Sequence, residues 1–379
     1  MFSEIVLALW SCTGLTWWML AARLSAEDQG ESGEVPDSPA RRTLSVFKPL
    51  PPLGASGLKV VAEGIESFVA QLDPESELLL GIHEVDRDFT EPFLDRLRTQ
   101  YPKTRLKVVF RFEPDSVANP KIAWQKILAQ QAEGELWLWS DADVIAPTGF
   151  LQSARNEYAR CGAAMVTFPY VIRKIPAPAA LLEALFVNVE FYPGVLLLRK
   201  FGPVDFGLGA AMVFQRDDFL RQVDWNEIGA TLADDFFLGQ KLGPVRIGTT
   251  TLATVPGSFT WKQALAHDLR WAKTIRWNRP AGSFARIMVM PVPGWLIAAA
   301  LHPTHFFIWI GLVGMIQADV FFAAAICRNA GCQLKPGQIP GLEAWSLWRI
   351  LLWFLCWLPW PVLWSEKKWR GPRSNLTVN

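Results

Sequence analysis

Two aspartates separated by a single residue follow a short apolar run. The run covers residues 136–139, and Asp141 and Asp143 come just after it. A buried strand of an open α/β sheet delivers such residues to its carboxyl end, where these sheets bind ligands. Carboxylate oxygens are the ligands that Mg²⁺ and Mn²⁺ prefer. The pair predicts a metal site that holds a diphosphate, although such triplets also occur as turns or helix caps.

A second acidic pair, Asp234 and Asp235, precedes an apolar segment with helical spacing. Helix capping accounts for one of these carboxylates more readily than for both. The stretch 261–277 then combines an apolar stripe with basic residues and tryptophans, a pattern typical of a helix at a membrane surface or of an ordinary amphipathic helix. Within it, Arg270 is suited to contact a diphosphate while the Trp271 indole packs over an acceptor.

Apolar runs alternate with segments of helical spacing from residue 44 to residue 168. We expect strands at 44–47, 77–82, 106–110, 136–139 and 163–168, and helices near 57–71, 90–100, 120–133 and 148–160. This order predicts an α/β fold with a mostly parallel sheet. Asn119 and Pro120 supply a cap and a first-turn proline for the third helix. Lys48, Glu84 and Asp141 then share the carboxyl edge of the sheet.

The segment between residues 169 and 260 is rich in proline and glycine, which predicts loops and short helices. Gly207 and Gly209 would let the backbone pass close to a ligand, or they form a tight bend.

Composition limits the classes of function. The chain has 37 Lys and Arg against 36 Asp and Glu, which argues against broad electrostatic capture of nucleic acid. Its hydrophobic fraction of 51% and its 19 tryptophans indicate that part of the surface faces lipid. The five cysteines form no CxxC pair, and we expect free thiols, with Cys327 and Cys332 as the one pair close enough to bridge.

Membrane segments are expected at both ends. We predict an anchor at 1–24 rather than a cleaved signal peptide, a flexible linker at 25–43 and a membrane region at 281–365. That region holds two spans, 304–326 and 344–363, after a proline-broken segment that dips into the interface. Asp319 and Arg349 are costly inside such spans, and Arg349 needs a partner there.

The tail at 366–379 is basic, and the positive-inside rule places it in the cytosol. Counting back two spans places the catalytic part in the cytosol and the N-terminus outside. The chain is therefore expected to be a multi-pass membrane protein.

The motifs together resemble the ceramide glucosyltransferase family and its bacterial hopanoid-associated relatives, within the inverting glycosyltransferase family 2 group. The resemblance covers about residues 44–280 and implies a GT-A fold with a Rossmann-like, mostly parallel sheet. The matching segments are SVFKPL at 45–50, ANPKIAW at 118–124, SDADVIAP at 140–147, GLGAAMVF at 207–214, LADDFFLG at 232–239 and HDLRWAKTIRW at 267–277.

The resemblance also implies roles for single residues. Lys48 and Pro49 belong to the nucleotide-binding first strand, and Asn119 to Lys121 line the donor pocket. Asp141 and Asp143 hold the metal and the diphosphate.

Further implied roles fall on the second half of the catalytic part. Asp235 is the general base, and Asp234 before it stands where the family usually has Glu and joins the nucleotide-sugar site. Arg270 and Trp271 match the Arg-Trp of the family's Q/RxxRW motif. The first position of that motif is His267 here.

Two of these assignments keep an alternative. A second Arg-Trp register exists at Arg276 and Trp277. The uracil-binding acid lacks a clean match in the sequence GIHEVDRD; Glu84 is our choice, with Asp86 as the alternative.

These features predict transfer of a sugar from a UDP-sugar to a lipid hydroxyl, such as ceramide or a hopanoid polyol, with inversion and with Mg²⁺ or Mn²⁺ as cofactor. No further carboxylate presents itself as a covalent nucleophile, which favours single displacement. The competing interpretations are a polymerising synthase, for which the predicted spans are too few to build a channel, and an inactive nucleotide-sugar-binding membrane scaffold.

Overall fold

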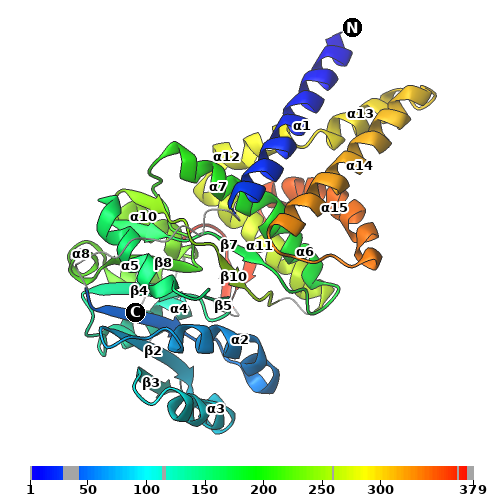
Figure 1. The fold of residues 1–379 in the computed structure, drawn as a ribbon. Coiled ribbons are helices and arrows are strands. Elements are labelled where there is room, and N and C mark those ends of the chain that lie inside the picture. Colours follow the sequence, from blue (N-terminus) through cyan, green and yellow to red (C-terminus); the bar gives the residue numbers. More distant parts are fainter. Residues whose placement is uncertain (1, 29–41, 113–116, 258–259, 365–366, 374–379) are drawn as a thin grey trace. The chain divides into compact units, whose positions relative to one another are not determined.

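The computed structural model describes residues 2–28, 42–112, 117–257, 260–364 and 367–373, which form two compact units (Figure 1). The unit that contains the large sheet, here the sheet unit, consists of Ser32–Val171, Leu197–Val255 and Arg373–Asn379. The other, here the helical unit, consists of Met1–Glu31, Ile172–Leu196 and Pro256–Pro372.

A seven-stranded sheet organises the sheet unit, in the order β3-β2-β1-β4-β8-β6-β9. Its strands are β1 (Leu44–Pro49), β2 (Ser76–His83), β3 (Arg105–Arg111), β4 (Leu136–Ser140), β6 (Met165–Thr167), β8 (Ala211–Gln215) and β9 (Val245–Ile247). Neighbours among β1 to β4 are parallel, β8 is antiparallel to both β4 and β6, and β6 is parallel to β9. The predicted mostly parallel α/β sheet is confirmed.

A smaller sheet of order β5-β10-β7 lies beyond the end of β4. It consists of β5 (Val144–Ile145), β7 (Tyr170–Ile172) and β10 (Leu252–Thr254). Antiparallel pairing of β5 with β10 places Val144 opposite Thr254. Because β5 follows Asp143 directly, this sheet fixes the chain that leaves the predicted metal site.

Helices join the strands in the predicted order. In the sheet unit they are α2 (Gly54–Val69), η1 (Glu84–Asp86), α3 (Arg87–Gln100), α4 (Pro120–Ala129), α5 (Phe150–Cys161), α8 (Arg216–Gln222), α9 (Trp225–Gly229) and α10 (Asp234–Leu242). The predicted cap of α4 is confirmed, since the Asn119 side chain accepts hydrogen bonds from the backbone N–H groups of Lys121 (3.0 Å) and Ile122 (3.3 Å). The expected helix 120–133 ends earlier, at Ala129. After it, Gly134 lies so close to Ser45 that a Cβ on Gly134 would be 2.5 Å from the Ser45 backbone nitrogen.

Aromatic side chains fill the core beside β4. Trp137 and Trp139 lie two residues apart and so point to the same face of the sheet. Both are buried, with the Trp137 ring 5.1 Å from that of Phe47 and the Trp139 ring 5.2 Å from that of Phe219. Tilted and edge-on contacts of this kind add to the burial of apolar area. The apolar run before Asp141 is therefore a core strand, which gives the acidic turn a rigid support.

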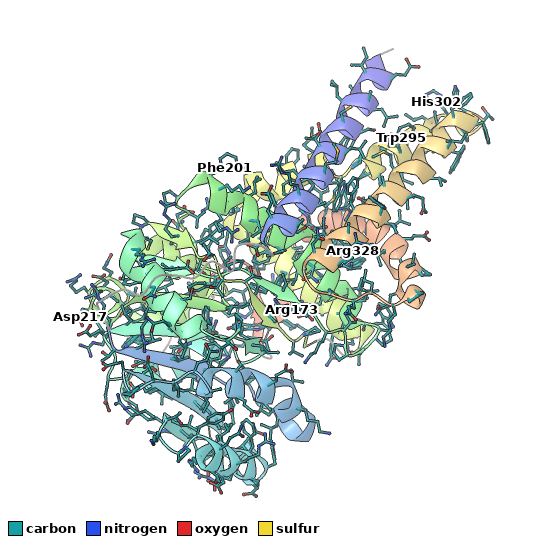
Figure 2. All side chains as sticks on the ribbon, viewed as in Figure 1. Arg173, Phe201, Asp217, Trp295, His302 and Arg328 are labelled. Carbon is teal, nitrogen blue, oxygen red and sulfur yellow. The ribbon has the colours of Figure 1, made fainter. Side chains whose placement is uncertain are left out.

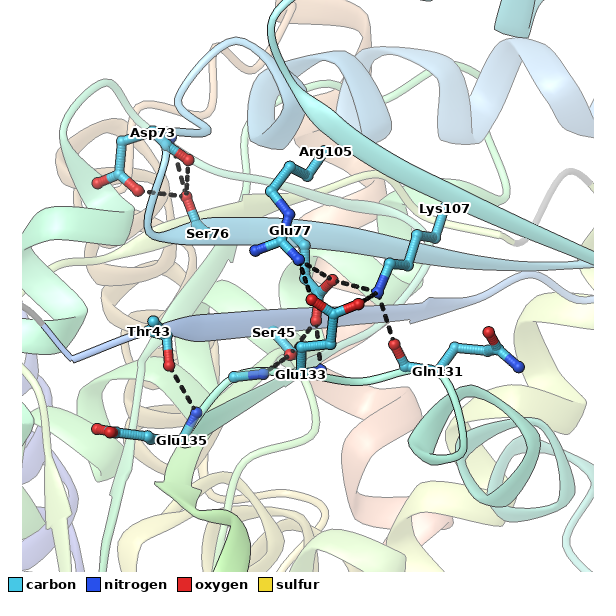
Figure 3. A network of polar contacts seen from close by, with 11 residues as sticks. Thr43, Ser45, Asp73, Ser76, Glu77, Arg105, Lys107, Gln131, Glu133 and Glu135 are labelled. Atoms are coloured by element: carbon cyan, nitrogen blue, oxygen red, sulfur yellow. Dashed lines mark hydrogen bonds and ion pairs between the residues drawn. The ribbon is translucent and has the colours of Figure 1, made fainter.

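A network of hydrogen bonds and ion pairs connects residues at the amino ends of the central strands (Figure 3). Glu77 of β2 is buried, and its carboxylate accepts hydrogen bonds from the Ser45 hydroxyl (2.6 Å) and the Glu133 backbone N–H (2.7 Å). Lys107 lies 2.7 Å from the same carboxylate and Arg105 lies 3.5 Å from it. This charge is buried but well supplied with donors, as buried carboxylates must be.

The helical unit holds most of the long apolar helices. Its elements are α1 (Phe2–Asp28), α6 (Ala180–Leu185), η2 (Phe186–Phe191), α7 (Tyr192–Phe201, which runs on into the sheet unit), α11 (Trp261–Asn278), α12 (Pro280–Ala285), η3 (Arg286–Val289), α13 (Val292–Leu301), α14 (Phe306–Asn329), η4 (Pro336–Gln338), α15 (Ile339–Trp357), β11 (Val362–Trp364) and β12 (Lys367–Trp369). Among the described residues, four helical segments are long and apolar enough to cross a membrane. They are Glu4–Asp28, Ala180–Phe201, Phe306–Asn329 and Pro336–Trp357.

Several membrane boundaries differ from those expected. The first helix continues to Asp28, so residues 25–28 are helical and not linker, while 29–41 lie outside the described residues. The span expected at 344–363 ends at Trp357 because Pro359 and Pro361 cannot continue a helix. Part of the 366–379 tail forms β12, and residues 374–379 lie outside the described part of the chain.

The expected catalytic domain 44–280 is also divided. Its segment at α6 and η2, and the helix α11, fall in the helical unit. Their apolar side chains explain this, because Leu182 and Leu185 pack in one cluster with Trp345 of α15, and Ala272 of α11 packs with Leu352. The segment Ala180–Phe201 has the length and apolarity of a membrane span, which sequence reasoning did not predict.

The proline-broken segment is bent as predicted. Pro280–Val289 and Val292–Leu301 meet at 62°. The second arm, α13, then packs on α14, where a Cβ at Gly311 would lie 2.0 Å from the Trp295 ring. Figure 2 labels Trp295 within α13, with His302 at the turn after it and Arg328 near the opposite end of α14.

The two charged residues predicted to be costly in the spans are paired with each other. Arg349 of α15 forms an ion pair with Asp319 of α14, and Ser346 donates a hydrogen bond of 2.7 Å to the same carboxylate. The Arg349 guanidinium also lies 4.8 Å from the rings of Trp18 and Trp345. The expected partner of Arg349 is therefore Asp319.

Candidate active site

The Asp-Ala-Asp sequence forms the turn between β4 and β5. Val144 donates a backbone hydrogen bond of 3.4 Å to the carbonyl of Asp141, which closes the turn, and the Asp141 N–H donates to the Ala210 carbonyl (3.3 Å). Asp141 and Asp143 are half-buried. Both carboxylates thus stand at the carboxyl edge of the parallel strands, as the sequence predicts.

Lys121, in the first turn of α4, connects two acidic motifs that are far apart in the sequence. Its Nζ lies 2.6 Å from Asp141 Oδ1 and 3.1 Å from Asp234 Oδ2. Asn119 reaches the same place, since its side-chain amide donates to the Thr231 carbonyl (3.1 Å) and to Asp234 Oδ1 (3.5 Å). The structure therefore assembles the predicted donor-pocket residues around one lysine.

The glycine-containing loop before β8 brings Asp235 to this cluster. The Gly207 N–H donates a hydrogen bond of 3.0 Å to the Asp235 carbonyl. A Cβ at Gly209 would lie 3.1 Å from Asp141 Oδ2 and 3.4 Å from Asp235 Oδ2. Gly209 is therefore close to both the predicted metal-binding and the predicted base carboxylate, and its missing side chain leaves room for both.

Burial and neighbouring charges raise the pKa of two carboxyl groups. Burial and the adjacent Asp234 raise the pKa of Asp235 to about 7, although Lys121 opposes the shift. Burial and Asp141 raise the pKa of Asp143 to about 6 against the hydroxyl of Thr254 and the charge of Lys48. Carboxyl groups with raised pKa values that share a site are typical of functional centres.

Two lysines in the site have opposite shifts. Burial lowers the pKa of Lys48 to about 7, in spite of the nearby Asp143 and Asp141. Burial acts the same way on Lys121, but Asp141 and Asp234 outweigh it and raise its pKa above the usual value. Lys121 is therefore the permanent positive charge of the site.

Lys48 lies under the acidic turn. It is fully buried, and its Nζ donates hydrogen bonds to the carbonyls of Asp141 (2.7 Å) and Val144 (3.2 Å) while lying 4.3 Å from the Phe68 ring centre. These bonds hold the backbone of the turn. The predicted nucleotide-site lysine of the first strand thus supports the acidic turn directly.

The donor set can be compared with what a divalent cation needs. Within the described residues, no group of three or more His, Cys, Asp or Glu side chains is arranged to hold a metal. Mg²⁺ commonly binds through one or two carboxylates together with water and substrate phosphates. Asp141 and Asp143 fit that kind of site, in which the substrate completes the coordination.

The acids after β2 do not contact this cluster. Glu84 is half-buried, and Arg87 donates a hydrogen bond of 3.1 Å to its carboxylate. Asp86 is buried, and its Oδ2 accepts the Leu53 N–H (2.9 Å). Pro49, the last residue of β1, stands opposite Gly81 of β2.

Arg270 and Trp271 lie on α11 in the helical unit. The Trp271 ring is 5.6 Å from Phe186 and 4.9 Å from His267, the first residue of the motif. Burial and the nearby Arg270 lower the pKa of His267 to about 3, so its imidazole is neutral.

In the second register, at Arg276 and Trp277, the first position of the motif falls on Lys273, and this residue has another role. Lys273 is buried, and its Nζ donates to the carbonyls of Leu358 and Trp360, both at 2.6 Å. These bonds satisfy carbonyl groups just beyond the end of α15, as basic side chains near helix ends commonly do. Arg276 lies 5.4 Å from the Trp357 ring centre.

One residue in contact with the site escaped sequence reasoning. The Thr254 hydroxyl donates a hydrogen bond of 2.9 Å to Asp143 Oδ2 across 111 residues of sequence. No motif marks a lone threonine in a short strand, so the β5–β10 pairing is the signal that reveals it.

Comparison with known proteins yielded one family. Glycosyl transferase family 21 matches residues 4–379 of the chain. No curated protein matches.

The solved structures that match the chain include three of stated activity or ligand. The mannosyltransferase PcManGT from Pyrobaculum calidifontis, in complex with GDP-Man and Mn²⁺, has 16% identity and a TM-score of 0.47, covering 94% of this chain and 96% of that one. S. aureus TarS 1-349 with UDP-GlcNAc has 13% identity and a TM-score of 0.37, covering 82% and 89%. Glucosyl-3-phosphoglycerate synthase from Mycobacterium tuberculosis, with Mn²⁺, UDP and phosphoglyceric acid, has 15% identity and a TM-score of 0.35, covering 60% and 78%.

Proposed function

Because the chain belongs to glycosyl transferase family 21, we propose that it transfers a sugar from a UDP-sugar to a lipid hydroxyl at a membrane surface. The match confirms the resemblance found in the motifs and makes the chain a glycosyltransferase. The mostly parallel α/β sheet agrees with the GT-A fold that this resemblance implies. The donor nucleotide, the acceptor and the residue roles are our proposals.

One observation supports the proposed chemistry most strongly. The carboxylates of Asp141 and Asp235 both lie within contact distance of a Cβ placed on Gly209, and Lys121 lies against Asp141 and Asp234. A sugar transfer needs stabilisation of a leaving diphosphate on one side of the anomeric carbon and a base on the other. The two sets of carboxylates meet this requirement within a single edge of the sheet.

Asp235 is our proposed general base. Its raised pKa of about 7 suits proton abstraction near neutral pH, because a base works best when its pKa is close to the operating pH. The carboxylate would accept the proton of the acceptor hydroxyl as that oxygen attacks the anomeric carbon. A single displacement inverts the configuration at this carbon.

Asp141 and Asp143 are the proposed ligands of Mg²⁺ or Mn²⁺. When bound, such an ion neutralises charge that develops on the leaving diphosphate. Lys121 adds a fixed positive charge beside Asp141, and with Asn119 and Asp234 it would position the nucleotide sugar.

Three further residues complete the proposed nucleotide site. Lys48 would hold the acidic turn from below, at the end of the strand that also carries Pro49. Glu84 is favoured over Asp86 for the uracil contact, because the Asp86 carboxylate is buried and occupied by the Leu53 N–H.

A lipid acceptor is supported by the helical unit. Four helical segments among the described residues have the length and apolarity of membrane spans, and several large apolar side chains on them are exposed, such as Leu9, Phe307 and Phe354. A lipid hydroxyl lies at the membrane interface, where the α11 helix is suited to sit. We propose Arg270 and Trp271 as its functional pair, since Lys273 of the other register is engaged by backbone carbonyls.

Ceramide and a hopanoid polyol are the proposed acceptors, and the catalytic part is proposed to face the cytosol. The basic side chains of Lys367 and Lys368 on β12 agree with a cytosolic tail.

The test is a transfer assay on the purified full-length protein in detergent or lipid. A panel of UDP-sugars is combined with ceramide, a hopanoid polyol and other lipids, with and without Mn²⁺, and products are identified by mass spectrometry. We expect a metal-dependent glycolipid. Hydrolysis of the donor without a lipid product would reject these acceptors, a polymer would favour the synthase, and failure to bind any donor would favour the inactive scaffold.

A further inference from the structure

We propose that Thr254 is a positioning residue that fixes the carboxylate of Asp143 for metal binding. The inference rests on the proposed function, because it takes Asp143 to be a metal ligand. Thr254 would act through Asp143 and would not touch the substrate.

Two hydrogen bonds from the end of β10 converge on Asp143. The Thr254 hydroxyl donates to Asp143 Oδ2 at 2.9 Å, and the next residue, Val255, donates its backbone N–H to the Asp143 carbonyl at 3.2 Å. Thr254 is buried, and its backbone is set by the antiparallel register opposite Val144. The hydroxyl therefore comes from a rigid strand rather than from a mobile loop.

The opposite side of the turn is also held. Lys48 donates to the carbonyls of Asp141 and Val144. A Cβ at Gly64 of α2 would lie 2.7 Å from the Val144 carbonyl oxygen, so this helix packs directly on the turn. With the backbone fixed from both sides, the rotation of the Asp143 side chain is the freedom that remains, and the Thr254 hydroxyl restrains it.

A restrained carboxylate binds a cation more tightly because its side chain loses less conformational entropy on binding. An ionised carboxylate has about four lone-pair sites, so a hydroxyl donor on Oδ2 leaves room for a metal. Loss of such an outer partner of a metal ligand typically weakens metal affinity by about 10- to 100-fold. The same range is expected here.

Three variants of the full-length protein separate this role from simple packing. Thr254→Val keeps the side-chain volume and removes the hydroxyl, while Thr254→Ser keeps the hydroxyl. Thr250→Val is the matched control, because the Thr250 hydroxyl lies 3.0 Å from that of Ser153, in the loop that leads to the same strand. Thr254→Ala serves as a second hydroxyl-free variant if Val does not fold.

Mn²⁺ binding is measured from the electron paramagnetic resonance signal of the unbound ion, and the transfer assay is carried out on the same variants. We expect Thr254→Val to weaken Mn²⁺ binding by about 10-fold or more. The Mn²⁺ concentration for half-maximal transfer should rise by a similar factor, and this change should exceed any fall in kcat. Thr254→Ser should restore tight binding, and Thr250→Val should match the wild type.

Two results would overturn the inference alone: Thr254→Val binding Mn²⁺ as the wild type does, or Thr254→Ser binding it as weakly as Thr254→Val. A wild-type protein that binds no Mn²⁺, or one whose Mn²⁺ binding is unchanged by Asp143→Asn, would instead reject the proposed metal site and this inference with it.

Discussion

At the amino ends of the central strands, the buried Glu77 carboxylate is surrounded by donors from Ser45, Lys107 and the Glu133 backbone. At the carboxyl ends, Asp143 and Asp235 are half-buried beside other carboxylates. Burial by itself would raise the pKa of the carboxyl groups at both edges. At Glu77 the hydrogen bonds and Lys107 outweigh burial and lower the pKa, while at Asp235 burial and Asp234 dominate and raise it to about 7.

The difference lies in the supply of donors. At the amino edge, hydrogen bonds and Lys107 keep the Glu77 carboxylate ionised, so the contacts of this edge contribute to the stability of the fold (Figure 3). The carboxyl edge gathers more carboxylates than cations around Lys121, so its groups are ready to exchange protons or to take up a cation. Four variants test whether stability and activity divide between the two edges in this way.

Replacement of the proposed base should have the largest effect. Asp235→Asn keeps the shape of the side chain and removes its basicity, so we expect kcat to fall by about 10²- to 10⁴-fold with a normal melting temperature. The transfer assay and a thermal unfolding curve measure this. Near-normal transfer in a folded Asp235→Asn protein would show that the base is another group.

Crowding between the carboxylates should have a smaller effect. A Cβ introduced by Gly209→Ala would lie 3.1 Å from Asp141 Oδ2, closer than ordinary contact, so the carboxylate has to shift. Misplacement of this kind can cost up to about 10²-fold, and we expect a fall in kcat/KM of about 10-fold. Gly194→Ala is the control, since nothing lies within 4 Å of its added Cβ. Equal activity of the two variants would mean that Gly209 tolerates a side chain.

The pH dependence should follow the pKa of Asp235. The base must be ionised, so kcat should decrease as the pH falls below about 7. Asp234→Asn removes a like charge and should lower the pKa of Asp235, which moves the decrease to lower pH even if the maximal rate falls. Full pH–rate profiles of both proteins provide the check. An unshifted profile would exclude Asp234 as a cause of the raised pKa.

At the amino edge, a change should alter stability and leave activity intact. Glu77→Gln weakens the contacts with Lys107 and Ser45, and we expect a loss of about 1–3 kcal/mol, seen as a lower melting temperature, with kcat within about twofold of the wild type. Glu133→Gln changes an exposed side chain, so it should lower the melting temperature less than Glu77→Gln does. A large fall in kcat for Glu77→Gln at a temperature where it is folded would contradict the division between the edges.

Much of the fold could be predicted because the local signals were strong. The alternation of apolar runs and helical segments predicted the parallel strands β1 to β4 and their helices, and Asn119 with Pro120 fixed the start of α4. The membrane helices near both ends were also foreseen. The segment Ala180–Phe201 was not, because proline- and glycine-rich neighbours obscured it and because its burial in the helical unit depends on contacts with distant helices.

The predicted site residues fall into two groups. Asn119, Lys121, Asp141 and Asp234 contact one another, since each lies at the end of a strand or the start of a helix along one edge of the sheet. The acids after β2 could not be assigned in the same way, because two carboxylates two residues apart fit the motif equally and only their hydrogen bonds distinguish them.

The sequence by itself determined the order of the acidic motifs, the strand that leads to Asp141 and Asp143, and the apolar helices near both ends, because these depend on residues close together in the chain. Tertiary structure alone decided that Lys121 joins Asp141 to Asp234, that Gly209 is close to both Asp141 and Asp235, and that Thr254 reaches Asp143. Pairing across about a hundred residues, and the pKa values that burial imposes, arise only when the strands have found their register.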